Sequence, residues 1–235
     1  MALQKGDFIL LDYIAKVKET GEVFDTTKEE TAKKEHLYKE GEIYEPKLVV
    51  IGEGWVLKAL DEGLTTMEIS KTTSTEVPPD KAFGERDPEK VRRVPLKHLT
   101  AKGITPTLGM RVEYNDKAAT VRTVGAGRVL LDFNLPLAGK TLVYEMTVQK
   151  KLGTISEKIA ALTHRRILAV EENKFKFTIR AKAVNVEMPE EAFYLEGIQV
   201  AKRGIATDIQ KFFPKITAVK FIETFKAEPK AEKKT

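Results

Sequence analysis

The stretch DYIAKVKETGEVFDTT, residues 12–27, alternates apolar and polar side chains on both sides of Gly21. Alternation with a period of two is typical of a strand with one buried face, and a glycine between two such runs favours a turn. The stretch therefore predicts a β-hairpin whose first strand begins near Phe8. The second strand places Phe24 directly before Asp25, and no cysteine, serine–histidine pair or metal ligand lies nearby to use that acid.

The next two segments differ sharply in polarity. Residues 28–46 are mostly polar and charged, which indicates a solvent-exposed connection. The sequence KLVV, residues 47–50, is followed by glycines and predicts a strand. In WVLKALDEGL, residues 55–64, apolar side chains recur at helical spacing and the pattern stops at Gly63, so we expect a short helix lying on the sheet.

Residues 86–132 interrupt this first domain. A strand-like stretch at residues 65–79 ends at paired prolines, and a strongly β-forming stretch appears only at 141–148. That second stretch is too apolar for a free end, so it needs sheet partners from before residue 86. Between them, short β-forming runs separated by YNDK and GAGR predict a small β-rich module with a short helix candidate, PLKHLTAKG.

The sequence after residue 153 predicts a small α+β domain. TISEKIAALTHRRI, residues 154–167, begins with the capping-box pair Thr154 and Glu157 and continues as an amphipathic helix. KFKFTIRAKAVNVEMP, residues 174–189, alternates as a strand, residues 190–214 supply helical material, and KITAVKFIETF alternates again. Residues 227–235 are a polar tail that we expect to be disordered.

The amino-acid composition excludes several kinds of chemistry and of location for this protein. The 235 residues include no cysteine, which excludes disulfides, thiolate catalysis and cysteine metal sites. No apolar run approaches the roughly 20 residues that a bilayer requires, and the first residues lack a signal-peptide pattern. We therefore expect a cytoplasmic protein without a membrane partner. Few asparagines and glutamines beside many lysines and glutamates favour a thermophilic source.

Charge is unevenly distributed, and the histidines are isolated. Residues 86–132 carry 10 basic and 5 acidic side chains, which leaves open contact with RNA or the ribosome, although a solvated charged surface is the favoured explanation of the excess. His36, His98 and His164 stand far apart and without a second ligand at metal spacing, so we expect no metal and no cofactor.

Four stretches in this order resemble the signature of FK506-binding-type (FKBP) prolyl isomerases: DYIAKVKETGEVFDTT, VVIGEGWVLKALDEGL, EVPPDKAFGE and NLPLAGKTLVYEMTV. The module between AFGE and NLPLAGKTL resembles the insert-in-flap domain of SlyD proteins, with RVPLKHL and LGMRV as its motifs. The region from TISEKIAALTHRRI to IETF, residues 154–225, resembles the long archaeal form of the family. The resemblance divides the chain into an isomerase domain (1–85 plus 133–153), an insert (86–132), a C-terminal domain (154–226) and the tail (227–235).

The resemblance implies an α+β fold, an antiparallel half-barrel around a short helix, with an apolar pocket between them. Matched motif by motif, the pocket residues are Tyr13, Phe24, Asp25, Val56, Leu57, Leu60, Phe83 and Tyr144. Two positions depart from the family pattern. Leu60 stands where a floor tryptophan is usual, while Trp55 lies five residues earlier, and Phe83 stands where a tyrosine is frequent.

The implied activity is peptidyl-prolyl cis-trans isomerisation, a rotation about an amide that needs no nucleophile or metal. The implied partners are unfolded or proline-containing polypeptides. In the insert, a set of apolar residues either fills a small core or faces outward to hold such chains: Val91, Val94, Leu96, Leu99, Met110 and Val112. The alternatives are a non-catalytic holdase chaperone and an RNA-associated factor. For the C-terminal domain, one expected role is homodimerisation.

Overall fold

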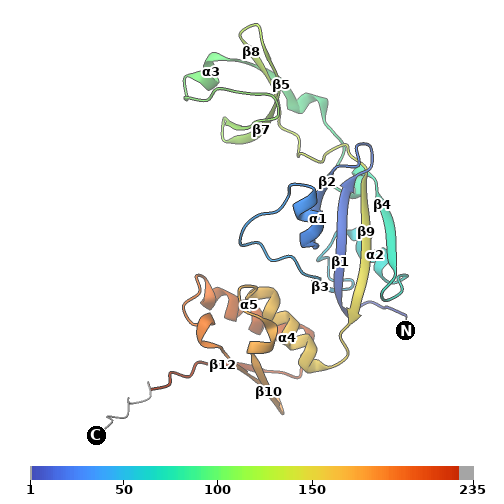
Figure 1. Cartoon of the computed structure of the whole chain (residues 1–235), viewed down its shortest axis with the longest axis vertical. Coiled ribbons are helices and arrows are strands. Elements are labelled where there is room, and N and C mark those ends of the chain that lie inside the picture. Colours follow the sequence, from blue (N-terminus) through green and yellow to red (C-terminus); the bar gives the residue numbers. More distant parts are fainter. Residues whose placement is uncertain (1, 228–235) are drawn as a thin grey trace.

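The centre of the structure is a five-stranded antiparallel sheet in which strands from the two ends of the sequence signature lie side by side (Figure 1). In this computed structural model, which describes residues 2–227, β1 (Phe8–Val17) pairs with β9 (Leu142–Lys151), and β9 pairs on its other side with β4 (Thr72–Val77). On its other edge, β1 pairs with β3 (Lys47–Val50) along its first half and with β2 (Val23–Thr26) along its second half. The predicted hairpin, and the predicted pairing of residues 141–148 with earlier strands, are confirmed.

One short helix, α2 (Lys58–Leu64), packs its apolar side chains into the core of this sheet. Leu60 and Leu64 are buried four residues apart, on the same helix face. The buried carboxylate of Asp61 accepts hydrogen bonds from the amides of Gly52 and Gly54 and so holds the loop that precedes the helix. Both glycines have a positive φ, which other residues rarely adopt, so the loop depends on them.

The connection from residue 28 to residue 46 differs from the prediction of a simple solvated excursion. It contains α1 (Glu29–Lys34), whose Ala32 is fully buried, and a stacked pair of rings, Tyr38 and Tyr44. Its later part turns back along the sheet toward β3 (Figure 1). The polar composition hid this packing because the segment buries few side chains and leaves many charged ones exposed.

Residues between β4 and β9 form a separate four-stranded unit. After two short 3-10 turns, Pro79–Lys81 and Pro88–Lys90, the strands follow in chain order but pair in the order β5-β8-β7-β6. Their bounds are Val91–Pro95, Arg111–Tyr114, Lys117–Gly125 and Arg128–Asp132 for β5 to β8, with α3 at Lys97–Thr100. The unit has its own apolar core and projects away from the five-stranded sheet (Figure 1).

A buried carboxylate joins the entry and exit of the four-stranded unit. Asp132 is 1% exposed and accepts hydrogen bonds from Arg86 at 2.9 Å and from Arg122 at 3.0 Å. Asn134 bonds to Asp132 and also exchanges two hydrogen bonds with the backbone of Asp87. These contacts hold the segment that enters the four-stranded unit against the segment that leaves it.

The last unit has three strands and two longer helices. It comprises α4 (Ile155–Arg166), a 3-10 turn at Glu172–Lys174, β10 (Lys176–Arg180), β11 (Ala183–Glu187), a 3-10 turn at Glu190–Ala192, α5 (Ile198–Phe212) and β12 (Ala218–Ile222). The predicted capping box at Thr154 and Glu157 is present. The single strand predicted over 174–189 is wrong: Ala181 adopts a positive φ of 49°, and the chain reverses there into a hairpin. Nearly all of the predicted tail, residues 228–235, lies outside the described residues.

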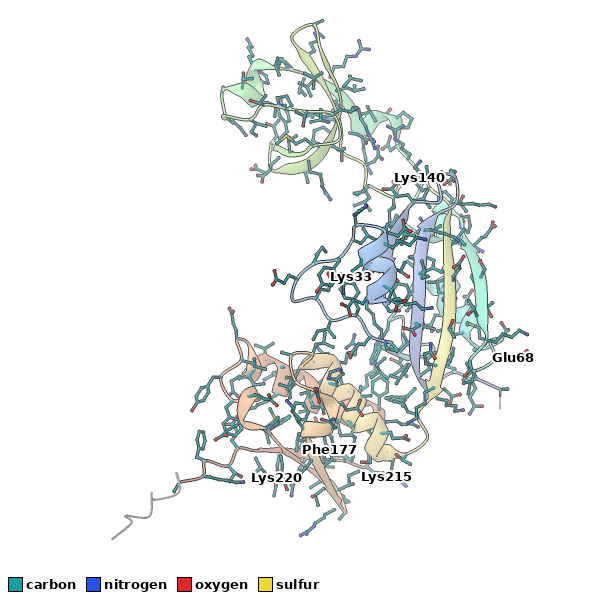
Figure 2. All side chains as sticks on the ribbon, in the orientation of Figure 1. Lys33, Glu68, Lys140, Phe177, Lys215 and Lys220 are labelled. Atoms are coloured by element: carbon teal, nitrogen blue, oxygen red, sulfur yellow. The ribbon has the colours of Figure 1, made fainter. Side chains whose placement is uncertain are left out.

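The three-stranded unit packs on the end of the five-stranded sheet through a shared core. Phe8, Leu48 and Val50 from the sheet belong to the same buried cluster as Ile159 and Ile209 of the two helices. Side chains fill the space between the units in Figure 2, where labelled Phe177 lies within the three-stranded unit. Across residues 2–227, we find no helix with the length and apolar character needed to span a bilayer.

Candidate functional site

A cavity of about 340 Å³ opens beside the five-stranded sheet. Its floor is formed by Leu60 of α2 and Met146 of β9, both buried. Val56 and Leu57, in the loop held by Asp61, form one wall. The lining is therefore mostly apolar, as is usual for sites that take up a small apolar group.

Aromatic rings close a second side of the cavity. Tyr13 of β1 and Tyr144 of β9 have ring centroids 6.2 Å apart, and Phe24 meets Tyr144 edge-on at 6.1 Å. Tyr144 and Ala15 are directly paired across the sheet, which places Tyr144 beside Tyr13. The register between β1 and β9 thus assembles the aromatic wall from residues more than 100 positions apart.

A chain of hydrogen bonds orders the rim. Lys47 donates to the Tyr13 hydroxyl at 2.8 Å, and this hydroxyl donates to Asp25 at 2.7 Å. Burial and the bond to the Asp25 carboxylate raise the pKa of Tyr13. Burial, together with the Asp25 charge, raises the pKa of Tyr144 to about 12. Both hydroxyls therefore stay protonated at neutral pH, and each has a proton to donate in a hydrogen bond.

The structure brings six of the eight predicted pocket residues into the cavity lining: Tyr13, Asp25, Val56, Leu57, Leu60 and Tyr144. Phe24 stands behind the lining, where its ring supports Tyr144. Phe83 is 38% exposed and does not line the cavity, so the expected role of this residue in the pocket has no contact to support it.

Further lining residues were not predicted from sequence: Ile43, Glu45, Lys47, Trp55, Arg165 and Leu168 are the main ones. Ile43 and Glu45 come from the connection that was expected to be solvated, and the last two come from the three-stranded unit. Trp55 lies in the loop before α2, so it cannot occupy the floor position on the helix. It packs edge-on against Phe212 instead, at 5.9 Å between ring centroids. An apolar or aromatic side chain is the only sequence signal for Ile43, Trp55 and Leu168, and the three charged residues carry no such signal.

In the four-stranded unit, the predicted client-binding residues divide between core and surface. Val94, Leu99 and Val112 are buried in the unit's core, Leu96 packs against that core, and Val91 is partly exposed. Of the two predicted roles, the core role holds for the three buried residues and the client-facing role is wrong for them, because their side chains hold the four short strands together. Met110 is 39% exposed, and two residues that were not predicted, Leu108 and Val124, are 78% and 43% exposed.

The cavity combines an apolar floor, a ring-lined wall and protonated hydroxyl groups at its rim. Within residues 2–227 there is no cluster of three histidine, aspartate or glutamate side chains arranged to hold a metal ion. Such a cleft can take up an apolar ring and act on the conformation of the attached chain. The fold and the cleft define a protein of the prolyl-isomerase class.

Comparisons with known proteins identify the family. Residues 92–137 match the family described as "FKBP26, IF domain", and residues 155–226 match "FKBP26_C-terminal". A short-type peptidyl-prolyl cis-trans isomerase of Methanocaldococcus jannaschii is 32% identical over 147 residues, which cover 63% of this chain and 92% of that protein. The FKBP-type peptidyl-prolyl cis-trans isomerase SlyD of Treponema pallidum is 29% identical over 120 residues, which cover 49% of this chain and 68% of the relative. The chain belongs to the FKBP-type peptidyl-prolyl cis-trans isomerases and has a SlyD-like architecture.

Proposed function

We propose that the ring-lined cavity is the site at which this isomerase rotates X–Pro amides of polypeptide substrates. The observation that carries the proposal is the convergence of Tyr13, Tyr144 and Leu60 on one largely apolar cleft. The barrier to uncatalysed rotation is roughly 18–20 kcal/mol, because rotation sacrifices the partial double bond. The planar amide is more dipolar than the twisted one, so an apolar cleft disfavours the planar form more and lowers the barrier.

Each wall of the cleft has a distinct task in this proposal. The proline ring lies over Leu60, with Val56 and Leu57 beside it. The Tyr144 hydroxyl has no hydrogen-bond partner among residues 2–227 and is available to a substrate carbonyl. This hydroxyl substitutes for the donor that Phe83 lacks. Asp25 orients Tyr13 through the 2.7 Å bond and is not a proton-transfer base.

Substitutions at Phe24 and Asp25 test this proposal. Phe24→Ala removes the ring behind Tyr144, and we expect kcat/KM on a proline tetrapeptide to fall by about 10- to 100-fold, since small misplacements of site groups have effects of this size. Asp25→Asn keeps an oxygen that can accept the Tyr13 bond, so we expect a loss of only about fivefold, from a weaker neutral hydrogen bond. Phe225→Ala, at a ring that follows β12 and is 66% exposed, is the matched control. Wild-type turnover in the Phe24 variant would contradict the assignment.

We also propose that the five-stranded sheet with α2 is the half-barrel of the isomerase domain, residues 1–85 plus 133–153, and that residues 86–132 are an inserted chaperone domain. The insert exposes Leu108, Met110 and Val124. A weak apolar surface tethered beside the cleft raises the local concentration of unfolded chains and so accelerates turnover on proteins more than on peptides. The excess of basic residues in the insert leaves RNA contact as a second prediction, which is testable by salt-dependent binding.

The C-terminal domain, residues 154–226, is the proposed dimerisation element. Its surface exposes Tyr194 and Val200 at 85% and 77%, and neither belongs to an apolar core of the described residues. Sedimentation of the full chain, compared with a variant in which Val200 is replaced by lysine, distinguishes a dimer from a monomer.

A further inference from the structure

Arg165 brings a positive charge from the three-stranded unit into the isomerase cleft. The residue lies in the last turn of α4 and lines the cavity. Leu168, just after this helix, also lines the cavity. Its guanidinium carbon is 4.0 Å from the centroid of the Trp55 ring. In Figure 1, α4 lies next to the end of the five-stranded sheet at which β9 ends. A cation from one unit is therefore held on an aromatic ring of another, within the substrate cavity.

The guanidinium of Arg165 has no carboxylate partner among residues 2–227, whereas both neighbouring side chains are paired. Arg166 forms an ion pair with Asp208 at 2.8 Å, and His164 bonds to Glu45 at 2.7 Å. Burial, and then the charge of Arg166, lower the pKa of Arg165, although an arginine stays protonated in proteins. A half-buried cation without a counter-charge is costly, and an anion that reaches it offsets that cost.

The other charged groups of the cavity are already engaged. Lys47 donates to Tyr13, Asp25 accepts from Tyr13, and Glu45 accepts from His164. Arg165 is thus the cavity cation whose donors are uncommitted. Stacking on Trp55 restricts the guanidinium plane, so less conformational entropy is lost when a ligand binds its edge.

We propose that Arg165 forms a carboxylate subsite that makes the enzyme prefer client segments with an aspartate or glutamate close to the proline. The inference rests on the proposed use of the cleft. Carboxylate is the ligand that fits, because the planar guanidinium can donate two parallel hydrogen bonds to it. The carboxylate comes from a side chain within the client, since unfolded chains present many acidic side chains but one terminal carboxylate.

Peptides with blocked ends test this subsite. One series is Ala-X-Pro-Phe and a second is Ala-Leu-Pro-X, each acetylated and amidated, with X as glutamate, glutamine or leucine. A leucine peptide with a free terminal carboxylate forms a third arm. Isomerisation is followed by NMR exchange for the full-length wild type, Arg165→Gln, Arg165→Lys and Arg203→Gln. Arg203 is an exposed residue of the same unit, and its replacement removes the same charge away from the cavity.

We expect the wild type to favour glutamate over glutamine by about tenfold in kcat/KM in at least one series, which corresponds to one charged hydrogen-bonded contact. Arg165→Gln should reduce this preference to within about twofold, while Arg165→Lys keeps part of it and Arg203→Gln keeps all of it. Thermal unfolding of each variant checks that the units stay packed.

Three results would overturn the subsite: no glutamate preference in the wild type, an undiminished preference in Arg165→Gln, or an Arg165-dependent gain only for the free terminal carboxylate. If the wild type turns over no peptide at all, the proposed function fails separately. The subsite is then judged by binding of the same peptides, measured through the fluorescence of Trp55, the single tryptophan of the chain. Tenfold tighter binding of the glutamate peptide, lost in Arg165→Gln, supports it, and equal binding refutes it.

Discussion

Replacing Asp132 by asparagine should destabilise the four-stranded unit and leave the cavity beside the five-stranded sheet unchanged. The carboxylate is 1% exposed and receives two arginines and Asn134. Burial raises its pKa, but the hydrogen bonds from Asn134, Arg86 and Arg122 outweigh that effect and lower the pKa from 3.8 to about 2. A carboxylate with a lowered pKa favours the folded state when it is ionised.

The size of this contribution follows from the shift in pKa. A difference of nearly two units corresponds to about 2 kcal/mol, at 1.36 kcal/mol per unit. The figure is an upper value, because Arg86 and Arg122 are about half exposed and solvent screens their charge. The stabilisation is fully present above the unfolded pKa, near pH 4, and is lost as the pH falls through about 2. Asp132→Asn should therefore cost up to about 2 kcal/mol at pH 7 and much less at pH 2.

Hydrogen exchange measured by mass spectrometry can report on this unit alone. We expect amides of β5 and β8 in Asp132→Asn to exchange up to about thirtyfold faster at pH 7, the equivalent of 2 kcal/mol, while those of β1 and β9 stay protected. Asp116→Asn, at an exposed turn of the same unit, is the control and should change stability by less than about 0.5 kcal/mol. Equal exchange in the two variants would refute the reasoning, as would an acid loss of protection in the wild type that Asp132→Asn shares in full.

Two other expectations concern the insert and the floor of the cleft. Deleting residues 87–131, or replacing both Leu108 and Met110 by serine, should lower catalysis of protein refolding by about three- to tenfold and leave tetrapeptide turnover nearly unchanged. The reason is that the tethered surface raises only the local concentration of large clients. Parallel losses in the two assays would argue against a separate client surface. Leu60→Ala should reduce the free energy of unfolding by about 3 kcal/mol, since it leaves a void under the cavity, as judged by urea unfolding. Leu135→Ala, at a residue that is 60% exposed, serves as its control, and a similar small change in both variants would show that Leu60 is not a core residue.

The local patterns of the sequence were sufficient for most strands and helices. The alternation around Gly21, the capping box at Thr154 and the turn at YNDK each describe interactions between residues that are near neighbours in the chain. Such interactions depend little on the rest of the fold, so they can be inferred without it. The misread hairpin at Ala181 shows the limit, because alternation continues through a turn when a non-glycine residue takes a positive φ.

Burial of individual side chains could be predicted less well from the sequence than secondary structure. Val94, Leu99 and Met110 are all apolar and lie in similar patterns, yet the first two are in the core of the insert and the third is partly exposed. The difference depends on how four short strands close over one another. A unit of this size has too few buried positions for periodicity alone to select them.

By itself, the sequence determined most of the strands and helices, the interruption of the sheet between β4 and β9, and, through family motifs, six of the residues that line the cavity. Tertiary structure alone decided the other walls of the cleft. Glu45 and His164 are 119 positions apart, and their bond brings the connection after α1 against α4, next to Arg165. Contacts of that kind produce no periodic pattern in the sequence, because neither partner is needed for the secondary structure of its own segment. The physical reason is that packing between units is fixed by complementary surfaces, which exist only after each unit has folded.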